Sequence, residues 1–401
     1  MKSALASTRN AIAARLGEMS FSRTELAGSL GDLGTFLPLT LGVAAVCGLD
    51  FGRVLLFAGA FNIVTGLIFR VPMCVQPMKA IATLAIAQQL SAGEVMAAGL
   101  IAGATVLVLA ACGLVARLAA IIPASVAAGI QLGLAAKLAW AAVGMSFLGQ
   151  RMIGWDSWGA ALIVLVILLA LANSQRIPGA LVVFVLGLGV AMARLTNAGA
   201  VSPAVSAAGL PLLSGFSAAA WHAAATQVPL TVTNSVLAVC ALSARLFPDR
   251  PASVQKVAVS VGTLNILGFM FGGQPMCHGA GGLAGQYRFG ARTAGSMVML
   301  GGVKIVCGLL FAGYLFHLFS VFPASVLGIM LLFSSFELAK AARNQTTIAD
   351  LGVCLVTAIL MFTIGAGPGL VAGVAVGILQ RRLGLNRSDV GAMQPVGLQI
   401  R

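Results

Sequence analysis

Between two long apolar runs, the chain reads Gly272-Gly273-Gln274-Pro275-Met276-Cys277-His278-Gly279-Ala280-Gly281-Gly282-Leu283-Ala284-Gly285. Glycine and proline at this density cannot continue an ordinary buried helix, so we expect the backbone to break at membrane depth. A broken backbone inside a bilayer needs protein or a polar cavity to satisfy its N–H and C=O groups. A helix that restarts after the break directs free N–H groups and a positive dipole end into that cavity. The stretch therefore predicts an anion site.

An earlier part of the chain repeats this arrangement. Asn62-Ile63 and Pro72-Met73-Cys74 recur as Asn265-Ile266 and Pro275-Met276-Cys277, at an offset of 203 residues. Two further matches are Thr35-x-x-Pro38-Leu39-Thr40 with Thr226-x-x-Pro229-Leu230-Thr231, and Pro123-Ala124-Ser125-Val126 with Pro323-Ala324-Ser325-Val326. Three matches in one order indicate two related halves of about 200 residues each.

The composition indicates a polytopic membrane protein. Of 401 residues, 59% are hydrophobic and 8% are charged, whereas soluble domains are about 25% charged. The net charge of +14 is scattered between apolar runs and not clustered with aromatic residues, which argues against a nucleic-acid partner. Seven cysteines without a CxxC pair and three scattered histidines predict no metal site, no cofactor and no enzymatic centre.

Fourteen apolar segments are expected. The first seven run over 26–47, 52–70, a short 76–91, 95–116, 121–145, 157–173 and 178–195, and the second seven over 226–247, 254–272, a short 277–288, 293–316, 322–341, 347–365 and 367–382. The predicted layout is a cytoplasmic lead-in (1–24), a first repeat (25–195), an interfacial linker (196–225), a second repeat (226–383) and a cytoplasmic tail (384–401).

The distribution of basic residues supports this count. With the N-terminus in the cytoplasm, inside connections hold 18 of the 24 Lys and Arg residues, and outside connections hold only Arg53, Arg151 and Arg194. Both termini are then cytoplasmic. Because seven is odd, the second half crosses the membrane in the opposite sense, which makes the halves an inverted repeat. The broken segments 3 and 10 then enter from opposite faces and can direct their N-termini at each other.

Two charged residues of the first half are candidates for function. Asp32 lies in segment 1, where an aspartate is costly and indicates function, although it could also cap a helix near the cytoplasmic end. Lys79 is the one basic residue of segment 3 and could attract an anion, pair with Asp32 or extend to the interface.

The second half contributes neutral donors and one histidine. Gln227, Thr231, Asn234 and Ser235 lie on segment 8, where they could bind a ligand or join helices. His278 follows the second break and could titrate near neutral pH or be structural. Residues 226–290 contain a single acid, Asp249, in a loop. The local field is therefore positive, and an oxyanion is the ligand that fits.

Four motifs resemble the molybdate-transporter branch of the sulfate permease superfamily. They are Gly31-Asp32-Leu33-Gly34-Thr35-Phe36-x-Pro38, Pro72-Met73-x-Val75-Gln76-Pro77-Met78-Lys79, Gln227-x-Pro229-Leu230-Thr231-x-x-Asn234-Ser235-Val236 and Cys277-His278-Gly279-Ala280-Gly281-Gly282-Leu283-Ala284-Gly285-Gln286-Tyr287. The resemblance implies a seven-plus-seven fold in which a core domain (segments 1–4 and 8–11) carries substrate against a gate domain (segments 5–7 and 12–14). It also implies molybdate as substrate with proton coupling.

The sequence thus predicts an all-α polytopic secondary transporter that imports molybdate by alternating access, as a proton symporter in a bacterial inner membrane. The expected substrate contacts are Thr35, Val75, Gln76, Lys79, Gln227, Thr231, Asn234, Cys277, His278, Gly279, Ala280 and Gly281, and the proton-coupling candidates are Asp32 and His278. Tungstate or sulfate as ligand, and a homodimer, are left open. The alternatives are a sulfate or other oxyanion permease, a nucleobase transporter and an anion channel.

Overall fold

The structure is a computed structural model that describes residues 17–117, 123–148, 150–172, 174, 179–197, 215–340, 343 and 347–382. Most of the expected lead-in, most of the linker and the tail after residue 383 lie outside the described residues. The first half contains α2 (Arg23–Ser29), the 3-10 turn η1 (Leu30–Asp32), α3 (Leu33–Cys47), α4 (Phe51–Phe69), β1 (Gln76–Pro77), α5 (Lys79–Gln88), α6 (Ala92–Ala111), α8 (Ala124–Phe147), α9 (Trp158–Leu171) and α10 (Gly179–Asn197).

The second half repeats this order. It contains α11 (Ala218–Leu230), the π-helix η3 (Thr231–Ala238), α12 (Val239–Leu246), α13 (Val254–Phe271), β2 (Met276–Cys277), α14 (Ala280–Arg288), α15 (Gly295–Ser320), α16 (Ala324–Lys340), α17 (Ile348–Thr363) and α18 (Ala366–Arg382). In each half the third segment is a short strand followed by a short helix.

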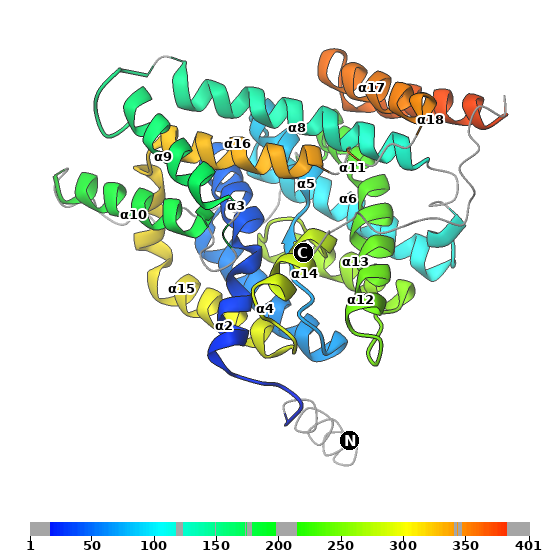
Figure 1. The fold of residues 1–401 in the computed structure, drawn as a ribbon, viewed down its shortest axis with the longest axis horizontal. Coiled ribbons are helices and arrows are strands. Elements are labelled where there is room, and N and C mark those ends of the chain that lie inside the picture. Colours follow the sequence, from blue (N-terminus) through cyan, green and yellow to red (C-terminus); the bar gives the residue numbers. More distant parts are fainter. Residues whose placement is uncertain are drawn as a thin grey trace.

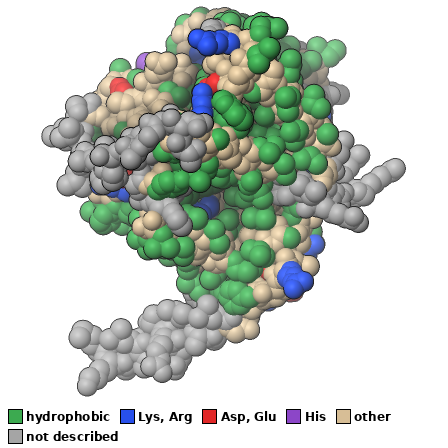
Figure 2. Space-filling view, turned by 90° about the vertical axis from the view of Figure 1, so that its left-hand side faces the viewer, with side chains coloured by type: hydrophobic (Ala, Val, Ile, Leu, Met, Phe, Trp, Pro, Cys, Tyr) green, Lys and Arg blue, Asp and Glu red, His purple; other side chains and the backbone are tan. Residues whose placement is uncertain are grey.

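The predicted membrane fold is confirmed. Within the described residues, six helical stretches are long and apolar enough to cross a membrane, and five shorter apolar helices accompany them. The half-helices α5 and α14, together with α16, complete seven segments in each half. Figure 2 shows a face dominated by hydrophobic side chains, with most of its Lys and Arg toward the top and bottom edges. A bilayer would cover such an apolar face.

Among the segment boundaries that differ from those expected, three bear on the site. The helix of segment 8 begins at Ala218, because Ser217 caps it by accepting from the Ala220 N–H. Residues 218–225 are therefore helical and do not belong to a linker. The helices of segments 3 and 10 begin at Lys79 and Ala280, three residues later than expected in each case, because the preceding residues form β1 and β2.

The two breaks meet each other through backbone pairing. β1 and β2 are antiparallel, with Gln76 opposite Cys277 and Pro77 opposite Met276. The Met78 N–H also donates to the Pro275 carbonyl at 2.9 Å. Extended backbone at membrane depth is thus satisfied by its counterpart from the other half. This pairing places the N-termini of α5 and α14 close to one another.

Small residues allow some helices to pack closely. A Cβ added to Gly59 of α4 would lie 2.6 Å from the Gly301 carbonyl of α15, and one added to Gly31 would overlap the backbone of Gly285. Close approach through small residues is typical of helices that associate within membranes. Here it joins segments of opposite halves.

The helices form two neighbouring groups. α8, α16, α17 and α18 run together across the top of Figure 1, while α4 packs with α15 and α6 with α13 below them. α5 and α3 contact α8 and α16, respectively, between the groups. The division into core and gate domains stays a prediction.

Candidate functional site

A small pocket, the main cavity, lies where the two half-helices meet. Its lining comes from both halves: Gln76, Lys79, Gln131, Gln227, Leu230, Asn234, Ser235, Cys277, His278 and Leu338. Among these described lining residues, the one charged side chain is Lys79 and none is acidic. The cavity therefore presents amide, hydroxyl and ammonium groups, which are donors suited to an anion.

The N-terminus of α5 is capped by a side chain from the other half. Gln227 Oε1 accepts hydrogen bonds from the Ala80 N–H at 2.9 Å and the Ile81 N–H at 3.4 Å. Its Nε2 donates to Thr231 Oγ1 at 2.9 Å. The first N–H groups of a helix have no partners within the helix, and Gln227 satisfies two of them here. Gln227 thus organises the site, and its acceptor is already occupied.

The N-terminus of α14 has no such cap. Gly279 precedes the helix and has no side chain to accept from the first turn. In the described part of the chain, no hydrogen bond reaches the N–H groups of Ala280 or Gly281 from outside the helix. A Cβ added to Gly281 would meet nothing within 4 Å, so this turn borders open space. The turn therefore combines free donors with a positive dipole end.

Other glycines of this stretch are required by close packing. A Cβ added to Gly279 would overlap the Gln76 side chain, and one added to Gly282 would lie 2.7 Å from Asp32 Oδ1 and overlap the Cys74 sulfur. α14 is thereby pressed against segment 1 and β1. Glycine at 279 and 282 thus has a structural cause beyond approach to a ligand.

Asp32 is buried and lies next to the cavity wall. Gln76 Nε2 donates to Asp32 Oδ1, and Gln76 itself lines the cavity. Asp32 Oδ2 has no hydrogen-bond partner among the described residues. A buried carboxylate oxygen without a donor is costly, which indicates a functional role. The Gln76 amide is the direct connection between this carboxyl group and the cavity.

His278 is fully buried, and both ring nitrogens are engaged. Its Nδ1–H donates to the Cys74 carbonyl at 3.0 Å, and Nε2 lies 2.9 Å from the Ser260 hydroxyl. The ring also packs edge-on against Phe69, with centroids 5.6 Å apart. These contacts join the two breaks, so the His278 imidazole has a structural role.

The polar residues of segment 8 divide into two groups. Thr231 accepts from Gln227, and Ser235 Oγ donates to the Cys277 sulfur at 3.2 Å. The first bond lies within one helical stretch, and the second joins segment 8 to β2. Asn234 is half-buried, lines the cavity and makes no side-chain hydrogen bond within the described residues. The π-helical turn that carries them changes the spacing expected for an α-helix, and such turns are frequent at functional sites.

Two equivalent asparagines hold the breaks in place. Asn62 Oδ1 accepts from the Val75 N–H at 3.1 Å, and Asn265 Oδ1 accepts from the Met276 N–H at 3.0 Å. The Val75 N–H is therefore occupied, which corrects its expected role as a donor to substrate. The Asn-Ile repeat at the offset of 203 has this structural explanation.

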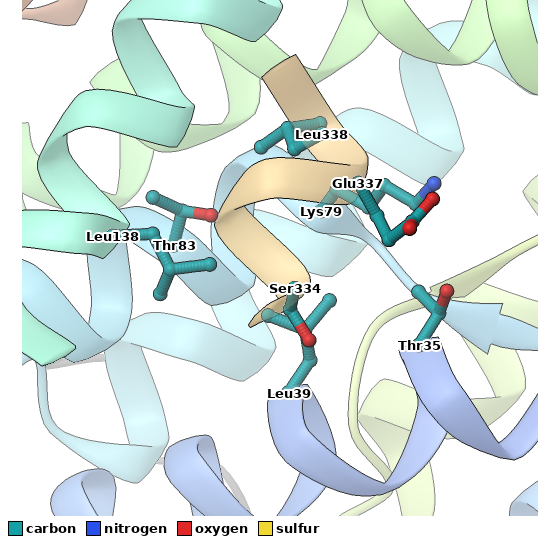
Figure 3. A pocket seen from close by; sticks show the side chains of 8 residues that line it. All are labelled: Thr35, Leu39, Lys79, Thr83, Leu138, Ser334, Glu337 and Leu338. Carbon is teal, nitrogen blue, oxygen red and sulfur yellow. The ribbon is translucent and has the colours of Figure 1, made fainter. Parts of the chain in front are cut away.

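Thr35 lies outside the main cavity. It lines a second small cavity, together with Leu39, Lys79, Thr83, Leu138, Ser334, Glu337 and Leu338. Figure 3 shows Lys79 and Glu337 extending from α5 and α16 toward the same side of this cavity. Lys79 and Leu338 line both cavities, so the Lys79 side chain lies between them.

Two residues of the region were not among the sequence candidates. Gln131 of α8 adds an amide to the cavity from the opposite group of helices. Lys304 of α15 is buried close to Asp32. A polar side chain in an otherwise apolar spanning helix was the signal available for both.

Known proteins are similar to this chain over most of its length. Residues 24–138 and 219–338 match the family described as "Molybdate transporter of MFS superfamily". These ranges contain every residue that lines the main cavity. Molybdate transporter 1 of Arabidopsis thaliana is 36% identical over 394 residues, covering 87% of this chain and 86% of that protein. Molybdate transporter 2 of the same plant is 35% identical, covering 92% and 89%.

Solved structures share the fold at lower identity. The transmembrane domain of the cyanobacterial bicarbonate transporter BicA has a TM-score of 0.64 and 17% identity, covering 89% of this chain and 98% of that one. The murine anion transporter Slc26a9 in its inward-facing state has a TM-score of 0.69 and 14% identity, covering 93% and 71%. The match over both halves and the identity to the plant proteins assign the chain to the molybdate transporter family, as an integral membrane protein with many spans.

Proposed function

We propose that this protein is a secondary transporter that imports molybdate by alternating access, coupled to protons. The observation that carries the proposal is the uncapped N-terminus of α14 beside a cavity whose single charged lining residue is Lys79. A dianion in this cavity gains the helix dipole and the ammonium charge, and no carboxylate of the described lining opposes it. The relatives named molybdate transporters support molybdate as that anion.

The proposed ligands are donors of the cavity lining and of the adjoining first turn of α14. They are the Lys79 ammonium, the amides of Gln76, Gln131 and Asn234, and the N–H groups of Ala280 and Gly281. Gln227 contributes by positioning α5. Gly279, Cys277, His278 and Thr231 shape the site through their packing and hydrogen bonds.

Alternating access is supported by the origin of the cavity wall. Gln131 and Leu338 come from α8 and α16, which belong to the group of helices across the top of Figure 1. The other lining residues come from the two backbone breaks, the first residue of α5 and segment 8. A displacement of one group along the other would open the cavity to one side and close it to the other.

Asp32 is the proposed proton carrier. Its carboxyl group is buried, one oxygen has no donor, and Gln76 links it to the cavity. Protonation would remove negative charge next to an entering dianion. His278 is the weaker candidate because both ring nitrogens are engaged.

The test is uptake of labelled molybdate into proteoliposomes that contain the purified protein, with and without an inward proton gradient. We expect saturable uptake that the gradient stimulates and that excess tungstate reduces. Sulfate and uracil serve as competitors for the oxyanion and nucleobase alternatives. Uptake of sulfate or uracil without molybdate uptake would exclude the proposed substrate, and a large unsaturable current would indicate a channel.

A further inference from the structure

Lys304 of α15 is a buried cation without a hydrogen-bond acceptor. Its side chain is 4% exposed, and Nζ has no partner among the described residues. An ammonium group inside a membrane protein normally pairs with a carboxylate or a carbonyl, because its desolvation is costly. The mechanism described above does not use Lys304. Its position therefore needs an explanation of its own.

The Lys304 ammonium lies over an aromatic ring. Nζ is 3.4 Å from the centroid of the Phe36 ring, a geometry in which the ring face attracts the cation. Phe36 follows Asp32 by four residues on segment 1, so the two side chains lie about one helical turn apart on one face. The Asp32 carboxylate therefore lies about one helical turn from the ring that the Lys304 ammonium contacts.

Asp32 and Lys304 are both buried and lie near each other. They form no ion pair within the described residues, where Asp32 Oδ2 and Lys304 Nζ have no hydrogen-bond partner. Asp32 Oδ1 is held by Gln76, whereas Oδ2 has no donor. Lys79 also acts on Asp32, and the Cys74 thiol lies near both Asp32 and Lys304. One carboxylate and two cations thus share a region of low dielectric constant.

We propose that Lys304 is a mobile counter-cation for the ionised Asp32 carboxylate. The Lys304 ammonium rests over Phe36 in the empty site and moves to Asp32 Oδ2 when an anion enters the cavity before Asp32 has taken up its proton. The inference rests on the proposed function in that the cavity takes an anion. An anion held by Gln76 brings negative charge within one side chain of Asp32. The anion and the Asp32 carboxylate repel each other strongly in the protein interior. A movement of the Lys304 ammonium toward Asp32, over about the length of one helical turn, would offset this repulsion.

The first test measures thermal unfolding in detergent without ligand. The proteins are the wild type, Asp32→Asn, Lys304→Met and the double variant. Asp32→Asn leaves the buried Lys304 ammonium without a nearby carboxylate, and Lys304→Met leaves the buried Asp32 carboxylate without this cation. We expect each single substitution to lower the unfolding temperature. The double variant removes both charges, so we expect it to unfold at a higher temperature than the sum of the single losses implies. Additive losses would show that the two buried charges do not compensate each other, and would overturn the proposal.

Lys137 provides a matched control. It is a lysine of α8 whose Nζ lies 5.8 Å from the Phe362 ring centroid and donates to the Phe362 carbonyl at 3.1 Å, in a contact apart from Asp32. Lys137→Met combined with Asp32→Asn should give additive losses. If Lys304→Met does not fold, Lys304→Gln repeats the cycle with a neutral amide of similar reach.

The second test measures molybdate binding by calorimetry in the same four proteins. Lys304→Met should weaken binding about tenfold when Asp32 is present, which is within the usual range of coupling between sites. The same substitution should change binding little in the Asp32→Asn background, because no carboxylate charge is left to compensate. Equal weakening in both backgrounds would overturn the proposal. If the wild type binds no molybdate, the proposed substrate fails, while the unfolding cycle still decides whether the charges of Asp32 and Lys304 compensate each other.

Discussion

Gln227 of α11 accepts a hydrogen bond from the Ala80 N–H of α5 at 2.9 Å. A side chain from the second half of the chain therefore completes the first turn of a half-helix from the first half. The equivalent turn of α14 begins after Gly279 and has no side-chain cap. The two half-helices thus differ in the capping of their first turns although they arise from related sequences. The first turn of α5 is bonded by Gln227, and that of α14 has no side-chain cap.

Gln227 can be tested with two substitutions that separate capping from charge. Gln227→Ala removes the acceptor and should lower the free energy of unfolding by about 1 kcal/mol. Gln227→Glu keeps an acceptor at a helix N-terminus, where negative charge is favourable, so its unfolding temperature should stay close to that of the wild type. The added charge should nevertheless reduce molybdate uptake strongly, because it faces the cavity. Uptake at the wild-type level in the glutamate variant would argue against an anion in this cavity.

Lys79 should contribute to affinity. Its side chain lines both cavities and forms no ion pair within the described residues. We expect Lys79→Gln to raise the KM for molybdate uptake by about tenfold, which corresponds to about 1.4 kcal/mol. Lys137→Gln is the control, since Lys137 interacts with Phe362 outside the cavity. A KM that changes equally in both variants would remove Lys79 from the site.

Adjacent glycines of α14 should respond differently to an added methyl group. In Gly282→Ala the new Cβ would overlap the Cys74 sulfur, whereas in Gly281→Ala it would meet nothing within 4 Å. Overpacking typically costs about 1–3 kcal/mol. We therefore expect Gly282→Ala to lower the unfolding temperature clearly more than Gly281→Ala, measured on purified protein in detergent. Equal unfolding temperatures would show that α14 can move away from segment 1.

The pH dependence of uptake separates the two proton-coupling candidates. Asp32→Asn keeps an oxygen that can accept from Gln76 but cannot carry a proton, so uptake should lose its stimulation by external acid. His278→Asn should instead lower stability, because the hydrogen bond from Nδ1 to the Cys74 carbonyl is lost, at about 1 kcal/mol. Its pH profile should follow that of the wild type. A flattened profile in the histidine variant alone would assign the proton to His278.

Features that depend on local composition could be predicted from the sequence. The density of Gly and Pro predicts the backbone breaks at segments 3 and 10. Short repeats such as Asn62-Ile63 and Asn265-Ile266 predict the division into two related halves. These features predict a backbone that leaves the helix and a partner region some 200 residues away. The antiparallel pairing of Gln76 with Cys277 is consistent with both.

Features that depend on distant neighbours could not be predicted. Gly282 is glycine because of Cys74 and Asp32, and the Val75 N–H is occupied because Asn62 reaches it. Neither contact has a signature in the nearby sequence. Lys304 does have a signature in the sequence, because a lysine inside an apolar segment is unusual. Only the three-dimensional arrangement shows that its ammonium lies over Phe36.

The pairing of β1 with β2 has a consequence for biosynthesis. During translation, segments 1–7 leave the ribosome long before residue 276 is made, so β1 enters the membrane without its partner strand. Its exposed backbone groups must then be hydrated or provisionally bonded, since unsatisfied groups are costly in hydrocarbon. The proposed anion site is therefore completed late, when segment 10 inserts. Truncation before that point should leave an intermediate that quality-control proteases recognise.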